Sequence, residues 1–411
     1  MNMQGLRTVY YGWYVVAAAF MVMLLGFGCA YSFATYFPDL EREFAASRAS
    51  VSSVFSLAGA LYFGLGAISG PLSDRFGPRW VCITGLIALS AGLSVAGSAD
   101  SLDTVYLGFG LGIGIGVGFS YVPAIGAVQP WFTTRRGFAS GLAVSGIGVG
   151  TLLGPLIATG LIATLGWRLS FVTMGLAAGV AGVGAALVLD NDPSRHADAV
   201  GAKRSGKCSA PSGMNLGQAV RTVPFWLLFL SWLSLSFAIF IPFVHIVPYA
   251  LDHGMSASAG ALVLGVIGVG STLGRFLVGA VADRFGRLPV MAMSFLGVAL
   301  MLLVWLVATS QWSLLAFGLV FGTCYGGFVA LAPAVAVDYF GTKATGAVIG
   351  VLYSGVGVGT FFGPPFAGYV FDRFESYQAA ILTAAGAAML AVVFLMLMPS
   401  TSRWQKRDNQ H

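Results

Sequence analysis

Twelve long apolar runs limit what this chain can fold into more than any other feature of its sequence. A helix that crosses a bilayer needs roughly 20 mostly apolar residues, and each run is about that long. The runs cover residues 12–37, 49–70, 80–98, 104–129, 138–163, 169–189, 224–250, 258–281, 288–309, 312–337, 344–368 and 377–398. The 21 basic and 15 acidic residues are too few to cover a water-soluble protein of 411 residues. We predict an all-α membrane protein with twelve transmembrane helices.

Polar sequence divides the runs into two sets of six. Residues 1–189 form the predicted N-terminal half, 190–222 a linker rich in charge, Pro, Gly and Ser, 223–398 the C-terminal half, and 399–411 a tail. Twelve spans place both termini on one side, where sixteen Lys and Arg residues lie, against four on the other. The excess of basic residues predicts that the termini, linker and tail are cytoplasmic, and we expect the protein in the inner (plasma) membrane.

Two segments repeat along the chain at one offset of 209 residues. GPLSDRFG (70–77) returns as GAVADRFG (279–286), and SGIGVGTLLGP (145–155) returns as SGVGVGTFFGP (354–364), identical at eight of eleven positions. The sequence therefore predicts two pseudo-symmetric six-helix halves in the same orientation, an architecture in which secondary transporters rock around a midplane site. Glycines at every fourth position of the second segment predict close helix packing: Gly146, Gly150 and Gly154, then Gly355, Gly359 and Gly363.

The sequence argues against several other classes of protein. The cysteines at 29, 82, 208 and 324 are too far apart for a disulfide framework or a metal knuckle. The basic residues are scattered over loops, so we expect no nucleic-acid partner. The glycine run 108–118 lacks the Lys-Ser/Thr of a phosphate loop. Without a nucleophile–base pair, we expect no enzyme, no cofactor and no metal; the short linker and tail leave no room for a signalling domain.

The repeated loop carries a resemblance to a known family. GPLSDRFGPR (70–79) and its copy GAVADRFGR (279–287) resemble the signature loop of the major facilitator superfamily, and the match covers essentially the whole chain. Within that family, YYGWYVVAAAF (10–20) and WFTTRRGFASGLAVSG (131–146) resemble the first residues of spans one and five in the monocarboxylate transporters and the oxalate:formate antiporters. The resemblance implies a major facilitator fold and a transport activity.

Arg275 lies in the middle of the eighth run, eight residues before Asp283, or about 12 Å along a helix from the loop. Its partner at the repeat offset is Gly66, so the two halves differ in charge at this depth. An arginine there costs about 2.5–3.5 kcal/mol on insertion scales, and a structural arginine would be expected to bring an acid. The same span contains no acid, and Ser271 lies one turn away. We interpret Arg275 as a cation for an anionic ligand; a purely structural role is the alternative.

One guanidinium group can bind one carboxylate through two parallel hydrogen bonds. The resemblance also implies that Arg275 binds the carboxylate of the substrate. Both related transporter groups place a substrate arginine in span eight. Oxalate exchange also uses a lysine in span eleven, but residues 344–368 contain none. In animal monocarboxylate transporters an aspartate, associated with proton coupling, precedes the arginine by four residues, and span one has a lysine. In this sequence the residue four positions before Arg275 is Ser271, and span one contains no charged residue.

Other residues could complete the site. His245, between Pro242 and Pro248 in span seven, is the proton-coupling and substrate-binding candidate because histidine titrates near neutral pH; it could instead cap carbonyls that the prolines free. Uncharged hydroxyls for a carboxylate or a 2-hydroxyl could come from Tyr31, Tyr121, Tyr325 and Tyr353, each of which could equally be a packing residue. Tyr31 and Tyr121 match aromatic positions of the oxalate:formate antiporters.

The repeated loops supply candidate gating residues. Their carboxylates and guanidiniums could form charge-assisted bonds that latch one state and break in the other; static loop solvation is the alternative. The candidates are Asp74, Arg75, Arg79, Asp283, Arg284 and Arg287.

The sequence predicts a monomeric secondary transporter of small monocarboxylates such as lactate or pyruvate, with a carboxylate anion, a proton and the lipid bilayer as its partners. Proton symport is the predicted coupling, because neutral co-transport avoids moving a bare charge against the membrane potential, about 2.3 kcal/mol per 100 mV. Carboxylate exchange of the oxalate/formate type is the alternative. Drug efflux is a remote alternative, because it usually calls for an acid in the cavity.

Overall fold

Long helices make up almost all of the structure. The computed structural model describes residues 10–132, 136–193 and 213–399. The first half contains α1 (Tyr11–Tyr31), α2 (Phe33–Glu43), α3 (Arg48–Phe76), α4 (Pro78–Gly97), α5 (Leu102–Val105), a π-helical segment (Tyr106–Leu111), α6 (Gly112–Val128), a 3₁₀ turn (Gln129–Trp131) and α7 (Arg136–Ala186). The second half contains α8 (Leu216–Ala219), α9 (Val223–Asp252), α10 (Ala257–Phe285), α11 (Arg287–Trp305), α12 (Gln311–Phe340), α13 (Thr345–Phe374) and α14 (Gln378–Met396).

Among the described residues, eleven helical segments are long and apolar enough to cross a membrane, and one of them, α7, is long enough to cross twice. α7 is a run of 51 residues that breaks at Gly166, where φ is 76° and ψ is 164°. At about 1.5 Å per residue it would measure roughly 75 Å, more than twice the roughly 30 Å hydrocarbon core of a bilayer. α7 therefore holds the predicted fifth and sixth spans, which confirms the twelve-span fold.

The helix boundaries repeat at the same offset as the sequence motifs. α3 and α10 have 29 residues each and begin 209 residues apart. The hydroxyls of Ser47 and Ser256 cap their N-termini by accepting from a backbone N–H three residues later. Gly77 and Gly286 end them with φ values of 84° and 90°, a conformation that favours glycine. The repeated loop therefore ends one span and begins the next in the same way in both halves.

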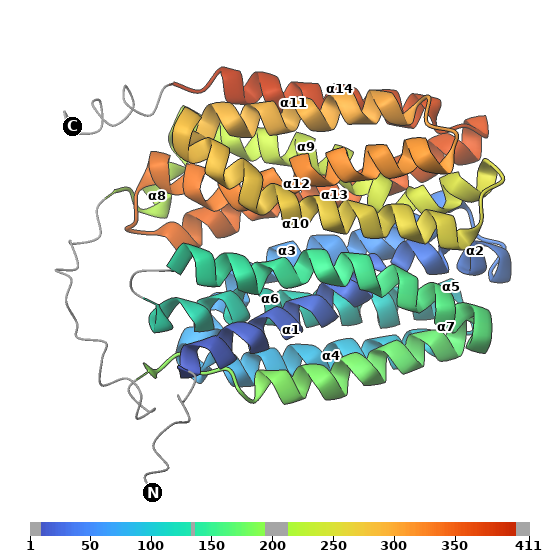
Figure 1. Ribbon diagram of the computed structural model, residues 1–411, viewed down its shortest axis with the longest axis horizontal. Helices are drawn as coiled ribbons and strands as arrows, with labels where there is room; N and C mark the ends of the chain where they lie inside the picture. The colour runs from blue at the N-terminus through green and yellow to red at the C-terminus, as the bar shows by residue number, and fades with distance from the viewer. Residues whose placement is uncertain (1–9, 133–135, 194–212, 400–411) are drawn as a thin grey trace, which may run out of the picture.

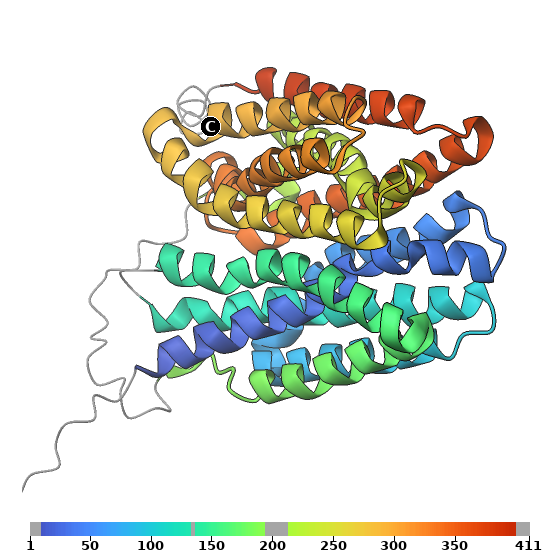
Figure 2. The ribbon, with the colours of Figure 1, turned by 45° about the vertical axis from the view of Figure 1, so that its right-hand side comes forward.

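The two halves form two helical bundles that lie side by side, α1–α7 in one and α9–α14 in the other (Figures 1 and 2). They meet through α3 against α13 and through α7 against α10. These two contacts are equivalent, because the repeat offset relates α3 to α10 and the first part of α7 to α13. The start of α1 and the end of α14 lie on the same side of the molecule, at the left in Figure 1, which we call the terminal side.

The predicted glycine seams are confirmed. A Cβ at any of the six glycines would meet backbone atoms of a neighbouring helix. The first row faces α1 and the second faces α9, at backbone positions that are again 209 residues apart. Small residues allow this close approach, which supplies van der Waals packing where lipid provides no hydrophobic driving force. The seam residues are Gly146, Gly150 and Gly154, with Gly355, Gly359 and Gly363 in the second half.

The predicted linker contains a short ordered segment. Asn215 and Gln218 form a capping box around α8, and the backbone N–H of Met214 donates to the carbonyl of Phe340 at 2.9 Å. The end of the linker therefore contacts the end of α12. Residues 194–212 of the linker and 400–411 of the tail lie outside the described residues.

The seam predicts a difference between two glycines of α7. Gly154→Leu should lower the stability of the purified protein by about 1–3 kcal/mol or more, because its side chain would meet the backbone of α1 at Gly28. Gly160→Leu is the matched control, since nothing lies within 4 Å of a Cβ there. The apparent Tm in detergent measures the effect, and equal Tm values for the two variants would contradict this account of the seam.

Candidate functional site

Arg275 lies in α10 at the interface between the halves, and one edge of its guanidinium is unpaired. The residue is 8% exposed. Its Nη1 donates to the carbonyl of Val144 in α7, across the interface, at 2.9 Å. Nε and Nη2 are buried without a hydrogen-bond partner, and no described acidic residue forms an ion pair with Arg275. These two nitrogens share the edge that binds a carboxylate through two parallel bonds, so the geometry favours an anionic ligand.

Four of the predicted tyrosines gather beside Arg275. All four lie close enough to its guanidinium for an electrostatic interaction, and the hydroxyl oxygens of Tyr31 and Tyr325 lie 3.3 Å apart across the two halves. The four, Tyr31, Tyr121, Tyr325 and Tyr353, line a central cavity of about 20 Å³ with Phe27, Phe63, Ile147, Phe240, Phe328, Val329 and Val356. The hydroxyl of Ser271, one turn from Arg275, is also buried and lacks a partner. The structure therefore brings these six predicted residues into one region.

Tyr62 belongs to this region, and the sequence analysis did not select it. Its hydroxyl is buried close to those of Tyr31 and Tyr325. The repeat contained the signal, because Tyr62 and Ser271 are equivalent at the offset of 209. Applying the offset to each residue around Arg275, rather than to Arg275 alone, would have identified Tyr62.

An apolar space, which we call the inner chamber, lies between the halves on the way to the terminal side. It measures about 240 Å³ and shares Phe63, Tyr121 and Tyr353 with the central cavity. Its walls come from α3, α6, α12 and α13. The remaining lining residues are Tyr62, Gly66, Ala67, Val122, Ile125, Pro333, Gly346, Ile349 and Gly350. The central cavity and the inner chamber therefore share part of their walls.

On the side opposite the termini, a charge network joins the halves. Arg48, in the first turn of α3, donates from Nη1 and Nη2 to the carboxylate of Asp252 at 2.6 and 2.9 Å, and from Nη1 to the hydroxyl of Tyr377 at 2.8 Å. Its Nε donates to Glu41 at 3.2 Å, and its guanidinium lies 3.7 Å from the ring centroid of Phe371. Asp252, Tyr377 and Phe371 all belong to the C-terminal half. We call Arg48 with these partners the outer clamp.

A second contact strengthens this closure. The carboxylate of Asp372 accepts from the backbone N–H groups of Arg48 and Ala49 at 2.9 and 3.0 Å. A carboxylate from one half thus caps the N-terminus of a helix in the other, where it also complements the helix dipole. The halves are therefore bonded together on the side opposite the termini, while the inner chamber separates them toward the terminal side.

The structure places His245 next to the outer clamp and not in the central cavity. Its Nε2 lies 2.8 Å from the carbonyl of Pro364, and its Nδ1 lies 3.1 Å from the hydroxyl of Tyr377. Because a carbonyl only accepts, Nε2 carries the proton and the neutral ring accepts from Tyr377 through Nδ1. Burial raises the pKa of the Tyr377 phenol, so this hydroxyl stays protonated. His245 is thus linked to Arg48 through Tyr377.

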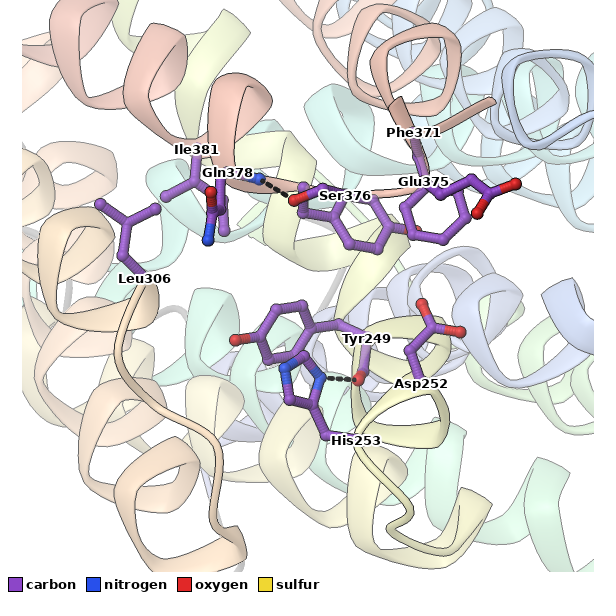
Figure 3. Close-up of a pocket in the computed structure, with 10 residues that line it drawn as sticks. Tyr249, Asp252, His253, Leu306, Phe371, Glu375, Ser376, Gln378 and Ile381 are labelled. Carbon is purple, nitrogen blue, oxygen red and sulfur yellow. Dashed lines mark hydrogen bonds between the residues drawn. The ribbon is translucent and has the colours of Figure 1, made fainter. Parts of the chain in front are cut away.

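A polar pocket of about 540 Å³ lies on the outer surface of the clamp (Figure 3). Asp252, Phe371 and Tyr377 line it, so three partners of Arg48 face this pocket. The ring of His253 stacks on Tyr249, with centroids 4.2 Å apart. Its other lining residues are Leu306, Glu375, Ser376, Gln378 and Ile381. The pocket shows that the clamp is reached from the side opposite the termini.

The repeated loops lie on the terminal side and do not join the halves. Arg287 pairs with Asp338 at 2.6 Å, from α11 to α12 within one half, and Nε of Arg79 donates to the carbonyl of Leu189 at 3.2 Å. The other candidates are exposed and form no ion pair with a described residue: Asp74, Arg75, Asp283 and Arg284. The predicted latch role of these loops stays a prediction.

Comparison with known proteins gives one consistent family. The model of the Major Facilitator Superfamily matches residues 16–280 and 246–411. Monocarboxylate transporter 11 of Mus musculus is 30% identical over 408 residues, which cover 95% of this chain and 88% of that protein. The Homo sapiens protein of the same name is 29% identical over 401 residues, 94% of this chain and 82% of that protein. MFS transporter asaE of Aspergillus flavus is 28% identical over 369 residues, 88% of this chain and 80% of that protein.

Solved structures show the same fold at lower sequence identity. A bacterial homologue of the human lysosomal transporter Spinster, in an inward-facing and occupied conformation, matches with a TM-score of 0.70 and 17% identity over 96% of this chain and 98% of that one. The unoccupied inward-facing form matches with a TM-score of 0.67 and 18% identity, over 95% and 96% of the two chains.

The outer clamp predicts which arginine holds the halves together. Arg48→Ala removes three charge-assisted bonds across the interface, each worth about 1.5–3 kcal/mol, so the outer side should open more often. In a cysteine-free variant that carries Phe37→Cys, which lies beside His245, labelling by an impermeant maleimide should rise about tenfold or more.

Arg42→Ala is the matched control, because Arg42 pairs with Asp39 within α2 and does not cross between the halves. Comparing labelling with and without Arg48→Ala, both in the Phe37→Cys variant, cancels the effect of the reporter itself. Equal labelling rates for Arg48→Ala and Arg42→Ala would show that the clamp does not hold the outer side closed.

Proposed function

The chain belongs to the major facilitator superfamily, and we propose that it transports small monocarboxylates such as lactate and pyruvate by alternating access. In support, the repeat relates two helical bundles that meet around Arg275, the arrangement expected of halves that rock around a midplane site. The protein is a multi-pass membrane protein and a transporter rather than an enzyme. The printed names of its relatives, monocarboxylate transporters of several animals, support the same substrate class.

The unpaired edge of Arg275 is the observation that carries this proposal. The carboxylate would bind Nε and Nη2, and the hydroxyls around the central cavity would bind its remaining lone pairs or a 2-hydroxyl. The residues that line the cavity and the inner chamber include no second cation. A dicarboxylate would leave one charge unpaired in a low-dielectric site, which is unfavourable. These lining residues include no Asp or Glu that could pair with a cationic drug.

We place the termini in the cytoplasm of a cell whose plasma (inner) membrane holds the protein as a monomer, on the basis of the excess of Lys and Arg on the terminal side. In this orientation the structure corresponds to an inward-facing state, since the outer clamp is closed and the inner chamber lies toward the cytoplasm. The exposed loop residues Asp74 and Asp283 would then form their bonds in the opposite state, when the outer clamp is open.

Proton symport is the proposed coupling, with His245 as the candidate proton site. His245 lies next to the outer clamp rather than beside the proposed substrate site, so it would gain a proton when the clamp opens and Tyr377 moves away. Uptake of one proton with one carboxylate moves no net charge against the membrane potential, worth about 2.3 kcal/mol per 100 mV. The link from His245 through Tyr377 to Arg48 supports a coupling that acts through the gate.

Carboxylate exchange is the second candidate, and one observation favours it. The residues that line the central cavity and the inner chamber include no Asp, Glu or His. An empty carrier would therefore move between states with the Arg275 charge uncompensated, whereas a loaded carrier is neutral there. A returning carboxylate would remove this cost and make exchange faster than net transport.

The substrate arginine is tested in proteoliposomes with radiolabelled lactate. Arg275→Ala should reduce uptake to background, and Arg275→Lys should retain the charge but lose the fork and transport about 10- to 100-fold more slowly. Unlabelled pyruvate and acetate should compete, whereas oxalate and a cationic drug should not. Normal transport by a folded Arg275→Ala variant would show that the arginine is structural.

The coupling is tested in the same vesicles with and without an inward proton gradient. Under symport the gradient drives accumulation, and His245→Gln should abolish this accumulation but leave exchange intact, because glutamine does not titrate. His253→Gln is the matched control, since among the described residues the imidazole of His253 hydrogen-bonds only the Tyr249 carbonyl of the preceding helix. Uptake that ignores the gradient but requires internal carboxylate would establish exchange instead.

A further inference from the structure

The pocket shown in Figure 3, which we call the outer pocket, is formed by the C-terminal half alone, since its ten lining residues lie between positions 249 and 381. We propose that it is a binding site for an organic guanidinium compound, which enters from the outer side, takes the place of the Arg48 side chain and holds the outer clamp open. The proposed ligand acts on the gate, so its site is separate from the carboxylate site at Arg275.

Residues of the outer pocket already bind one guanidinium group, which belongs to Arg48 of the other half. Asp252 accepts from its Nη1 and Nη2 at 2.6 and 2.9 Å, and the hydroxyl of Tyr377 accepts from Nη1 at 2.8 Å. The guanidinium carbon lies 3.7 Å from the centroid of the Phe371 ring. A carboxylate, a hydroxyl acceptor and an aromatic face are groups that recognise a planar guanidinium. The C-terminal half therefore carries a guanidinium site that the N-terminal half fills.

Separation of the halves on the outer side would take Arg48 out of this site. Its three partners would stay together, because all of them belong to the C-terminal half. Arg48 would keep an acid of its own half, since its Nε donates to Glu41 at 3.2 Å. Asp252 would lose its ion pair, because it pairs with no described Lys or Arg other than Arg48. A carboxylate beside aromatic rings without a counter-ion favours a replacement cation.

The lining of the outer pocket determines the chemical class of the ligand. The pocket measures about 540 Å³, enough for a short body beside the guanidinium group. Its lining residues include two acids, Asp252 and Glu375, and no Lys or Arg, so its electrostatic potential favours a cation. Leu306 and Ile381 lie at the opposite end of the pocket from these acids in Figure 3 and offer apolar surface to a short alkyl chain. The ligand class is therefore an alkylguanidinium ion.

The ligand and Arg48 compete for the same groups, so the ligand binds only when the halves have separated on the outer side. It therefore shifts the protein toward the state in which the outer clamp is open. Its apparent affinity in the wild type is reduced according to the fraction of molecules that are in this state. Removing the Arg48 side chain should strengthen ligand binding, whereas removing the Asp252 charge should abolish it, although both changes weaken the clamp.

The test measures binding of butylguanidine to the purified full-length protein by isothermal titration calorimetry. Butylurea has a similar shape without the charge, and butylamine has the charge without the planar group. The Kd of butylguanidine should be about tenfold or more lower in Arg48→Ala than in the wild type. Asp252→Asn should show no saturable binding of butylguanidine, and butylurea should bind to none of the proteins. Butylamine should bind to Arg48→Ala about tenfold more weakly than butylguanidine, because it cannot form two parallel bonds with a carboxylate.

Control variants and a second measurement accompany the titrations. Arg42→Ala should keep the Kd of the wild type, because Arg42 pairs with Asp39 within α2 and does not line the pocket. Arg48→Gln and Phe371→Leu are second variants for the cation and for its site, and should strengthen and weaken binding, respectively. In the cysteine-free Phe37→Cys protein, butylguanidine should raise the rate of maleimide labelling about threefold or more, whereas butylurea should leave it unchanged. Thermal melts show which variants fold.

Binding that loss of Arg48 strengthens and loss of Asp252 abolishes, with labelling that rises, would establish the guanidinium site. Absence of binding to the folded Arg48 variants, or the same Kd in them as in the wild type, would show that the ligand does not replace Arg48 and would overturn the proposal. Retained binding by folded Asp252→Asn would overturn it as well. Labelling that falls when butylguanidine is added would show that the ligand bridges the halves, which contradicts the proposed opening. None of these outcomes bears on carboxylate binding at Arg275.

Discussion

A buried cation with no acidic partner among the described residues is the constraint on which the rest of this protein depends. Charge in a low-dielectric interior is unfavourable unless it is paired, and two nitrogens of Arg275 have no protein partner. The fold supports this arrangement with the Val144 carbonyl from the other half and with neutral tyrosine hydroxyls rather than an acid. Val144 belongs to α7 and Arg275 to α10, so the hydrogen bond between them joins the two halves. A motion of one half relative to the other would therefore change this bond.

The repeat relates two closely packed helical bundles, and the proposed site lies where the repeat is broken. Glycine seams pack α1 against α7 and α9 against α13 at equivalent backbone positions, so each half holds its helices closely. The proposed site lies where the repeat equivalence fails: Arg275 corresponds to Gly66, and Ser271 corresponds to Tyr62. The outer clamp is also asymmetric, since Arg48 in one half corresponds to Ala257 in the other. Identical halves would form two identical gates, whereas these differences allow one side to close while the other is open.

Much of the fold and part of the site followed from the sequence alone, for local physical reasons. The length of the apolar runs and the scarcity of charge predict the spans, and the repeat at 209 residues predicts two related halves. Arg275 stands out because an isolated arginine in an apolar run is rare and costly. His245 shows the limit of such reasoning: two flanking prolines and a titratable ring suggest a ligand, but helix rotation directs the ring to Tyr377 and Pro364.

The sequence by itself determined the number of spans, the two related halves, the repeated loop and the one arginine in the middle of an apolar run. Each of these depends on residues close together in the chain or on the offset of 209 residues. Only the tertiary structure decided which side is closed, that Arg48 bonds to the other half there, and that an apolar chamber shares walls with the central cavity. Those features depend on how far the halves are tilted and on which helix faces meet across them. Residues hundreds of positions apart, such as Arg48 and Tyr377, come together only through that packing.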